Sequence, residues 1–323
     1  MGKRDNILIA LSKIDGITLE ILNQLPDNEV LSLKNQEDIF NYVNYNDIFD
    51  NQINKPYDEI SKAYNMALAI KEACAKDKVE IITKFDDGKY PERFKKLSNY
   101  PPFFFARGNS SILKKAGIAI IGTKHPSNKG SAWGTKLSQV ITNKGYVIIS
   151  GLAVGCDSCA HIGCLMAKGE TVAITPSPLN KIYPSQNKKL FQDILENNGC
   201  LISEYEFGHT TSLNDFVMRD RLQAGLAIGT IVIESSVTGG TLHAVNTTLE
   251  LKRPLAFLKF GEEHYTTYEH ARANKLFLDN NKAIPIANAL DIDKFLNECQ
   301  KADEISSTQD VTIKTDKIEQ SLF

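Results

Sequence analysis

Residues 117–151, GIAIIGTKHPSNKGSAWGTKLSQVITNKGYVIISG, decide the fold of this chain. An apolar run at 117–121 ends in Gly122 and a polar turn, and residues 131–145 then have the composition of a helix. A second apolar run, 146–150, again ends in glycine. A buried strand, a helix that stops at glycine and another buried strand predict a βαβ unit with two parallel strands.

The same alternation continues to about residue 260. The further strands that we expect are 171–176, 201–205, 230–235 and 254–260. The helices that we expect between them are 156–169, 187–199, 218–227 and 240–252. Apolar strands that alternate with helices predict an α/β fold, with a Rossmann-like, mainly parallel sheet and helices on both faces. Ligands of such sheets bind beyond the carboxyl ends of the strands.

The segments on either side of this pattern differ from it. Residues 1–77 lack strand-like alternation and predict a small all-helical domain of helix-hairpin-helix or SAM-like type, before a Rossmann domain at 78–300. The turn of that hairpin carries Thr18 where a second glycine is expected, which favours helix packing over DNA contact. Residues 301–323 are polar without apolar periodicity, so we expect a disordered tail.

Composition narrows the functional class. No apolar run approaches the roughly 18 residues that span a bilayer, and the start of the chain is not a signal peptide, so we expect a cytoplasmic protein with no membrane partner. The formal net charge is −2, yet residues 84–136 hold eleven Lys or Arg and three Asp or Glu. This basic stretch inside an acidic chain is a candidate anion-binding face. The Cys156–Cys159 pair lacks the further ligands of a zinc site, so we expect packing thiols, no metal and no cofactor.

Three glycine-rich turns follow expected strands: IGTKHPSNKG (121–130), SGLAVGCD (150–157) and SSVTGGTLHAV (235–245). Glycine lets a backbone approach a ligand, and exposed amides at a helix start favour anions. The spacing matches neither a dinucleotide fingerprint nor a Walker A loop. The candidate phosphate-binding residues in these turns are Gly122, Thr123, Lys124, Ser127, Gly130, Gly151, Gly155, Gly239, Gly240 and Thr241.

The sequence signals for a catalytic site are weaker than those for a phosphate-binding site. Ser150 precedes Asp157 and His161, but the chain has no G-x-S-x-G nucleophile elbow, so a structural hydrogen bond within that helix is the better interpretation. Glu204 and Glu234 both follow strands. They can act as a glycosidase-like acid and base, cap neighbouring helices, or pair with arginines.

Taken together, the motifs IGTKHPSNKG, ISGLAVGCDSCAH, YPSQN, LISEY, FVMRDR and TGGTLHA resemble the DNA-processing protein A (DprA/Smf) family over about residues 85–297. The resemblance implies binding of single-stranded DNA without catalysis, a homodimer formed through the Rossmann domain, and loading of a RecA-type recombinase in natural transformation, competence and recombination. The chain departs from the family pattern at Lys124, where arginine is usual, at Asp220, and in having no expected C-terminal winged helix.

The resemblance also implies further site residues. Arg219 and Arg221 match the family's Arg-Asn-Arg and are expected to hold phosphates, although Asp220 can pair with them. The candidates for stacking on bases are Tyr183, Phe216 and Trp133, and core packing is an equal alternative for Trp133.

The second hypothesis is a nucleotide sensor or phosphoribohydrolase of the related Rossmann subgroup, with phage defence as its setting. The turn Gly239-Gly240-Thr241 with Glu250 partly matches the signature of such enzymes.

Overall fold

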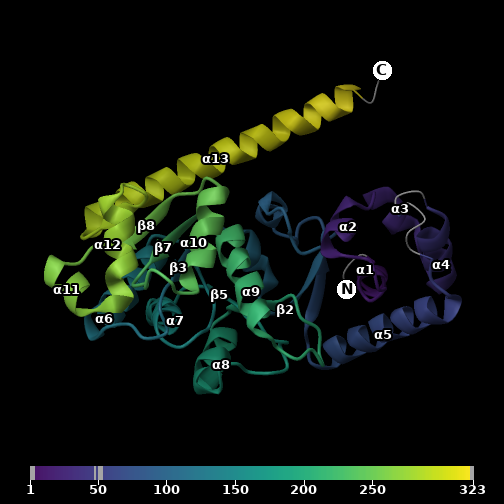
Figure 1. The fold of residues 1–323 in the computed structure, drawn as a ribbon, viewed down its shortest axis with the longest axis horizontal. Coiled ribbons are helices and arrows are strands. Elements are labelled where there is room, and N and C mark those ends of the chain that lie inside the picture. The colour runs from purple at the N-terminus through teal and green to yellow at the C-terminus, as the bar shows by residue number, and fades with distance from the viewer. Residues whose placement is uncertain (1–3, 47–48, 50–53, 321–323) are drawn as a thin grey trace. The chain divides into compact units, whose positions relative to one another are not determined.

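The computed structural model describes residues 4–46, 49 and 54–320, with side chains up to residue 306. The chain forms two compact units, here called unit 1 (residues 1–115 and 172–219) and unit 2 (residues 116–171 and 220–323). Figure 1 labels their helices and strands. This division differs from the predicted domains 1–77, 78–300 and 301–323. Residues 78–115, which the prediction assigned to the Rossmann domain, belong to unit 1 together with the residues before them.

Unit 1 begins with helices, as predicted. They are α1 (Asp5–Ser12), α2 (Leu19–Gln24), α3 (Asp27–Ser32), α4 (Gln36–Tyr45) and α5 (Tyr57–Lys76). Thr18, the residue that replaces a glycine of the hairpin motif, is the N-cap of α2, and its side chain accepts a hydrogen bond from the Ile21 amide at 3.3 Å. The turn before it depends on Gly16, whose φ of 90° suits glycine. Local capping therefore accounts for this turn.

The strands of unit 1 are β1 (Glu80–Thr83), β2 (Phe103–Gly108), β5 (Thr171–Ile174) and β6 (Cys200–Ser203). Their order is β1-β2-β6-β5, with antiparallel pairing of β2 to both neighbours and parallel pairing of β5 with β6. The strand β1, which has four residues, is not among the strands predicted from the sequence. The short helices η2 (Glu92–Lys96), η3 (Ser110–Lys114) and η4 (Ser185–Asn187) and the helix α8 (Lys188–Glu196) also belong to this unit.

Unit 2 holds the parallel sheet. Its strands are β3 (Gly117–Ile121), β4 (Val147–Ser150), β7 (Gly229–Val232), β8 (Leu255–Leu258) and β9 (Ile284–Ile286). They lie in the order β4-β3-β7-β8-β9, and every pairing between them is parallel. Their residues are buried on both faces except at β9, which explains why they lack polar alternation.

Helices cover both faces of the unit 2 sheet. Its helices are α6 (Asn128–Asn143), α7 (Cys156–Met166), α10 (Thr241–Glu250), α11 (Glu262–Thr267), η5 (Glu269–Ala271), α12 (Arg272–Asp279) and α13 (Ala289–Gln320). Ile120 and Ile231 pack with α6, α7 and α13 on one face, whereas Val232 and Phe257 pack with α10 and α12 on the other. Figure 1 shows α10 and α12 on the near side of these strands. The predicted α/β, Rossmann-like fold class is therefore confirmed.

Two helices differ in extent from the prediction. The helix α9 runs over Leu213–Leu226 and so begins five residues before the expected 218–227. Residues 301–320, predicted as a disordered tail, continue α13 to Gln320. Neither glycine nor proline occurs between Ile286 and Gln320, so nothing in the local sequence ends the helix.

Candidate nucleic-acid interface

The three glycine-rich turns of unit 2 meet at one edge of the sheet. They follow β3, β4 and β7, which are neighbours in the parallel sheet, so their carboxyl ends point the same way. Gly155 has a φ of 84°, and a Cβ there would lie 2.6 Å from the carbonyl oxygens of Thr123 and Lys124. The Cys156 amide donates to the Thr123 carbonyl at 3.1 Å. Glycine at 155 therefore serves contact between two turns of the protein.

The turn after β3 also packs against the end of β7. A Cβ on Gly122 would lie 2.6 Å from the Cys156 sulfur and 2.7 Å from the Glu234 carbonyl oxygen. The Thr123 amide donates to that same carbonyl at 2.7 Å. Burial raises the pKa of the Cys156 thiol well above its ordinary value, in agreement with a packing role for this cysteine.

A buried carboxylate closes the first turn. Glu234, which has no exposed surface, accepts hydrogen bonds from the Ser127 amide, the Ser127 hydroxyl and Nε2 of His264, each at 2.7 Å. The Ser127 hydroxyl in turn accepts from the Gly130 amide at 2.8 Å and caps α6. A Cβ on Gly130 would lie 2.4 Å from the Glu234 carboxylate. Of the three alternatives for Glu234, helix capping is the one that these contacts support.

Ser127 and Gly130 thus face a carboxylate of the protein at the place where the sequence analysis put a phosphate. An acidic side chain at a helix N-terminus satisfies the same amides as a phosphate does. Sequence reasoning missed His264, whose link to this turn depends on a helix that begins after β8. The signal that was available is Glu234 itself, directly beyond the strand beside the turn.

The other candidate residues of the turns differ in exposure. Lys124 is exposed, and so is Gly240, where an added Cβ would meet no atom within 4 Å. A Cβ added on Gly239 would lie 2.9 Å from the Ser236 hydroxyl oxygen. Thr241 is the first residue of α10. Gly151 is buried.

The two arginines of the Arg-x-Arg motif are buried. Arg219 is 5% exposed and Arg221 is 6% exposed. In unit 1, Arg219 donates to the Ile174 carbonyl at 2.7 Å. Residues 221–230 are buried throughout, so this end of α9 and the start of β7 belong to the interior. A phosphate role for these arginines stays a prediction, and the alternation of charge in Arg-Asp-Arg did not reveal their burial.

The three candidate base-stacking residues lie in two aromatic contacts. In unit 1, Tyr183 is 45% exposed and meets Phe216 edge to face, with ring centroids 5.6 Å apart. In unit 2, Trp133 stacks on Phe260 at 5.3 Å, and the Lys129 ammonium lies 4.7 Å from the indole centroid. One part of the Trp133 side chain packs on Phe260, as the packing alternative expects, and 38% of its surface remains exposed.

The residues of the catalytic alternatives are used elsewhere. The buried Ser150 hydroxyl donates to the Ile120 carbonyl at 2.7 Å, and Nδ1 of His161 bonds the Thr171 hydroxyl at 2.8 Å. Glu250 is the last residue of α10, nine residues from Thr241, and a helix of that length separates the two by about 14 Å. The Gly-Gly turn and Glu250 therefore do not form one site.

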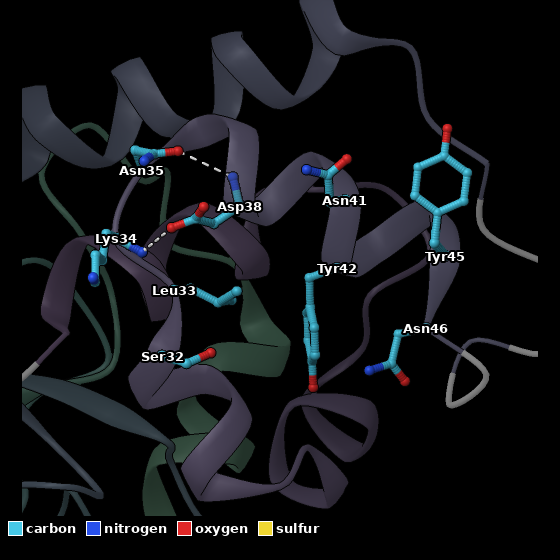
Figure 2. A pocket seen from close by; sticks show the side chains of 9 residues that line it. All are labelled: Ser32, Leu33, Lys34, Asn35, Asp38, Asn41, Tyr42, Tyr45 and Asn46. Atoms are coloured by element: carbon cyan, nitrogen blue, oxygen red, sulfur yellow. Dashed lines mark hydrogen bonds between the residues drawn. The ribbon is translucent and has the colours of Figure 1, made fainter.

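A polar cavity of about 650 Å³ lies in unit 1 beside α3 and α4, and it contains none of the candidate residues (Figure 2). Its polar groups serve local structure: Asn35 accepts from the Asp38 amide at 3.0 Å, and Asp38 accepts from the Lys34 amide at 2.7 Å. Figure 2 shows the ring of Tyr42 between these residues and Asn46.

Two absences hold for the part of the chain that the structure describes. No helix there is both long enough and apolar enough to cross a membrane. The described residues also contain no group of three or more His, Cys, Asp or Glu side chains that is placed to bind a metal ion.

Comparison with known proteins gives a family. Residues 81–297 match the profile of the family described as DNA recombination-mediator protein A. The chain is 35% identical over 172 residues to Protein Smf of Synechocystis, a match that covers 52% of this chain and 43% of that protein. It is 34% identical over 164 residues to the DNA processing protein DprA of Streptococcus pneumoniae, covering 51% and 57%. The match thus spans about half the length of these curated relatives.

Solved structures agree in fold. The X-ray structure of DprA from S. pneumoniae superposes with a TM-score of 0.74 at 25% identity, covering 90% of this chain and 98% of that one. The structure of DprA from Helicobacter pylori superposes with a TM-score of 0.59 at 26% identity, covering 69% of this chain and 96% of that one. That structure describes how the H. pylori protein binds single-stranded DNA.

Proposed function

The chain belongs to the DNA recombination-mediator protein A family, and we propose that it binds single-stranded DNA through the glycine-rich turns of unit 2 without chemical catalysis. The observation that carries the proposal is the meeting of three such turns at the carboxyl edge of β4, β3 and β7, with Lys124 exposed among them. The described binding of single-stranded DNA by the H. pylori relative supports the same ligand.

The contacts can be assigned to atoms that remain accessible. Glu234 already occupies the amide and hydroxyl of Ser127, the N-cap of α6, so a phosphate binds further out, at the Lys124 ammonium and at the exposed backbone around Gly240. Lysine offers a point charge that tolerates many phosphate positions, which suits a polymer bound without sequence preference. Tyr183 and Phe216 are retained as the base-stacking candidates, because the Tyr183 ring is partly exposed.

The wider role that we propose follows the family. It comprises action in DNA uptake and recombination as a cytoplasmic homodimer, with loading of a RecA-type recombinase. The absence of catalysis is also part of the proposal, since Glu234 is engaged by three hydrogen bonds and Glu250 lies at the far end of α10. Release of free base from a nucleoside monophosphate would contradict this part.

The substitution Lys124→Glu tests the site. It replaces an attractive charge with a repulsive one, so we expect about a ten-fold loss of affinity for labelled oligo-dT in fluorescence anisotropy. Lys282→Glu is the matched control, because Lys282 is also exposed but precedes β9, at the amino edge of the same sheet. Equal affinities of the two variants would show that the turns are not the binding site.

A further inference from the structure

Three stacked rings in unit 2 end at an exposed indole. Trp133 of α6 stacks on Phe260, with ring centroids 5.3 Å apart and ring planes inclined by 16°. Phe260 is buried and stacks in turn on His264, at 4.2 Å and 26°. Nε2 of His264 donates to the Glu234 carboxylate at 2.7 Å. The inner end of the stack is therefore fixed to the cap of the first glycine-rich turn, whereas the outer ring, Trp133, reaches solvent.

The face of the indole opposite Phe260 is not covered by its neighbouring cation. The Lys129 ammonium lies 4.7 Å from the Trp133 centroid and 5.8 Å from the Phe260 centroid. An ammonium directly over the opposite face would lie much farther from Phe260 than from Trp133, so Lys129 contacts the stack from the side. No other large hydrophobic side chain of α6 or of residues 250–275 is exposed, and both segments are described completely. Protein interfaces depend on clusters of apolar anchors, which these segments do not offer.

Lysines flank the indole along α6. Lys129, Trp133 and Lys136 have the i, i+4, i+7 spacing of one helix face, and all three are exposed. Gly134 and Leu137, on the other side of the helix, are buried. Among the side chains that the structure describes, no carboxylate lies within ion-pairing distance of either ammonium. An exposed ring between lysines suits single-stranded nucleic acid, because the ring can stack on a base while the cations hold phosphates.

We propose that Trp133 is a base-stacking platform of unit 2 and that it makes the DNA site selective for single strands. The inference rests on the proposed function and deepens it. A phosphate contact such as that of Lys124 is open to single and double strands alike, whereas the faces of duplex bases are covered by the neighbouring bases. Because Phe260 already holds the indole in place, a base that stacks on it orders little of the protein.

Trp133 is the one tryptophan of the chain, so its emission reports this site directly. The full chain is titrated with oligo-dT and, in parallel, with an abasic oligonucleotide of the same length, while the anisotropy of a label on each strand records binding. A stacked base quenches indole emission, so we expect quenching by oligo-dT that saturates together with the anisotropy, and none by the abasic strand. Unchanged emission at saturation, or equal quenching by the two strands, would overturn the inference.

Variants test the selectivity. Trp133→Leu keeps an apolar contact to Phe260 but removes the ring, so we expect about a ten-fold loss of affinity for oligo-dT and no change for a duplex of equal length. Trp133→Phe keeps a ring and should lose less. Leu276→Ala, at an exposed position of α12, is the control that should match wild type. Equal losses for single and double strands would overturn the inference, and the wild-type quenching decides the question alone if Trp133→Leu does not fold.

The flanking lysines are tested by the salt dependence of oligo-dT binding. Loss of two phosphate contacts in the double variant Lys129/Lys136→Gln should lower the magnitude of the slope of log affinity against log salt by about 1.4. The control is Lys252/Lys282→Gln, since both of these lysines are exposed and precede β8 and β9, at the amino edge of the sheet. Equal slopes for the two double variants would overturn the phosphate role of the α6 lysines.

The proposed function is judged separately in the same titrations. Binding of oligo-dT that depends on Lys124 but leaves the Trp133 emission unchanged removes only this inference. Absence of oligo-dT binding by the wild type removes both.

Discussion

Glu234→Gln should destabilise the protein far more than a change of one atom suggests. The Glu234 carboxylate is fully buried and accepts from two groups of Ser127 and from His264. One oxygen, Oε2, faces the Ser127 amide, and the other, Oε1, faces the Ser127 hydroxyl and the imidazole. Glutamine supplies one acceptor oxygen, and where its NH₂ group replaces Oε1, the Ser127 hydroxyl and the His264 imidazole that now donate to that oxygen must change role.

The magnitude follows from this mismatch. A hydrogen bond to a charged group contributes about 1.5–3 kcal/mol, and a buried donor left without an acceptor costs about 1–3 kcal/mol. Some relaxation is expected, so we predict a loss of about 2–4 kcal/mol in the free energy of unfolding. Urea denaturation followed by circular dichroism measures it, with Glu250→Gln, at an exposed position, as the control that changes by less than about 0.5 kcal/mol. A loss below about 1 kcal/mol for Glu234→Gln would refute the capping argument.

Two further predictions concern backbone and pH. Gly155→Ala adds a Cβ 2.6 Å from backbone atoms, whereas Gly145→Ala meets no atom within 4 Å at a similar φ of 88°. We therefore expect thermal unfolding to show a much larger loss for Gly155→Ala, and equal losses would mean that the turns do not touch. For Asp215, burial raises the carboxyl pKa but the bond from His209 at 2.7 Å and those from Ser212 outweigh it, so the pKa lies below its ordinary 3.8. A carboxyl whose pKa is lowered in the folded state stabilises the protein above pH 3.8. This stabilisation is lost as the pH falls through the folded-state pKa. The difference in Tm between wild type and Asp215→Asn should thus be present at pH 7 and shrink in acid, and a pH-independent difference would contradict it.

The fold was predictable because its signals are local and repeated. The strands β3, β4, β7 and β8 are short apolar runs, and the turns after β3, β4 and β7 contain glycine, so these elements could be placed from the local sequence pattern. The prediction failed to find β1, whose four residues gain their stability from pairing with β2. Pairing partners are distant in sequence, and single-strand patterns do not report them.

The site was less predictable, because it depends on burial. Arg219 and Lys124 both look like phosphate ligands in the sequence, yet Arg219 is 5% exposed and bonds a carbonyl, whereas Lys124 is exposed. A guanidinium satisfies buried carbonyls as well as it satisfies phosphates, since both offer oxygen acceptors. Residue type therefore identifies the chemistry that a side chain can perform, and only its surroundings decide which acceptor it meets.

Glu234 shows how the same pattern can serve two ends. Parallel strands bring their carboxyl ends together, so the residue that follows β7 reaches the turn that follows β3. An acidic residue there completes the helix start from within, and the glycine and serine of the turn then fit a carboxylate of the chain. A phosphate that approaches this edge meets a Ser127 amide that is already bonded to a buried carboxylate. We therefore expect exposed cations such as Lys124, rather than Ser127, to bind such a phosphate.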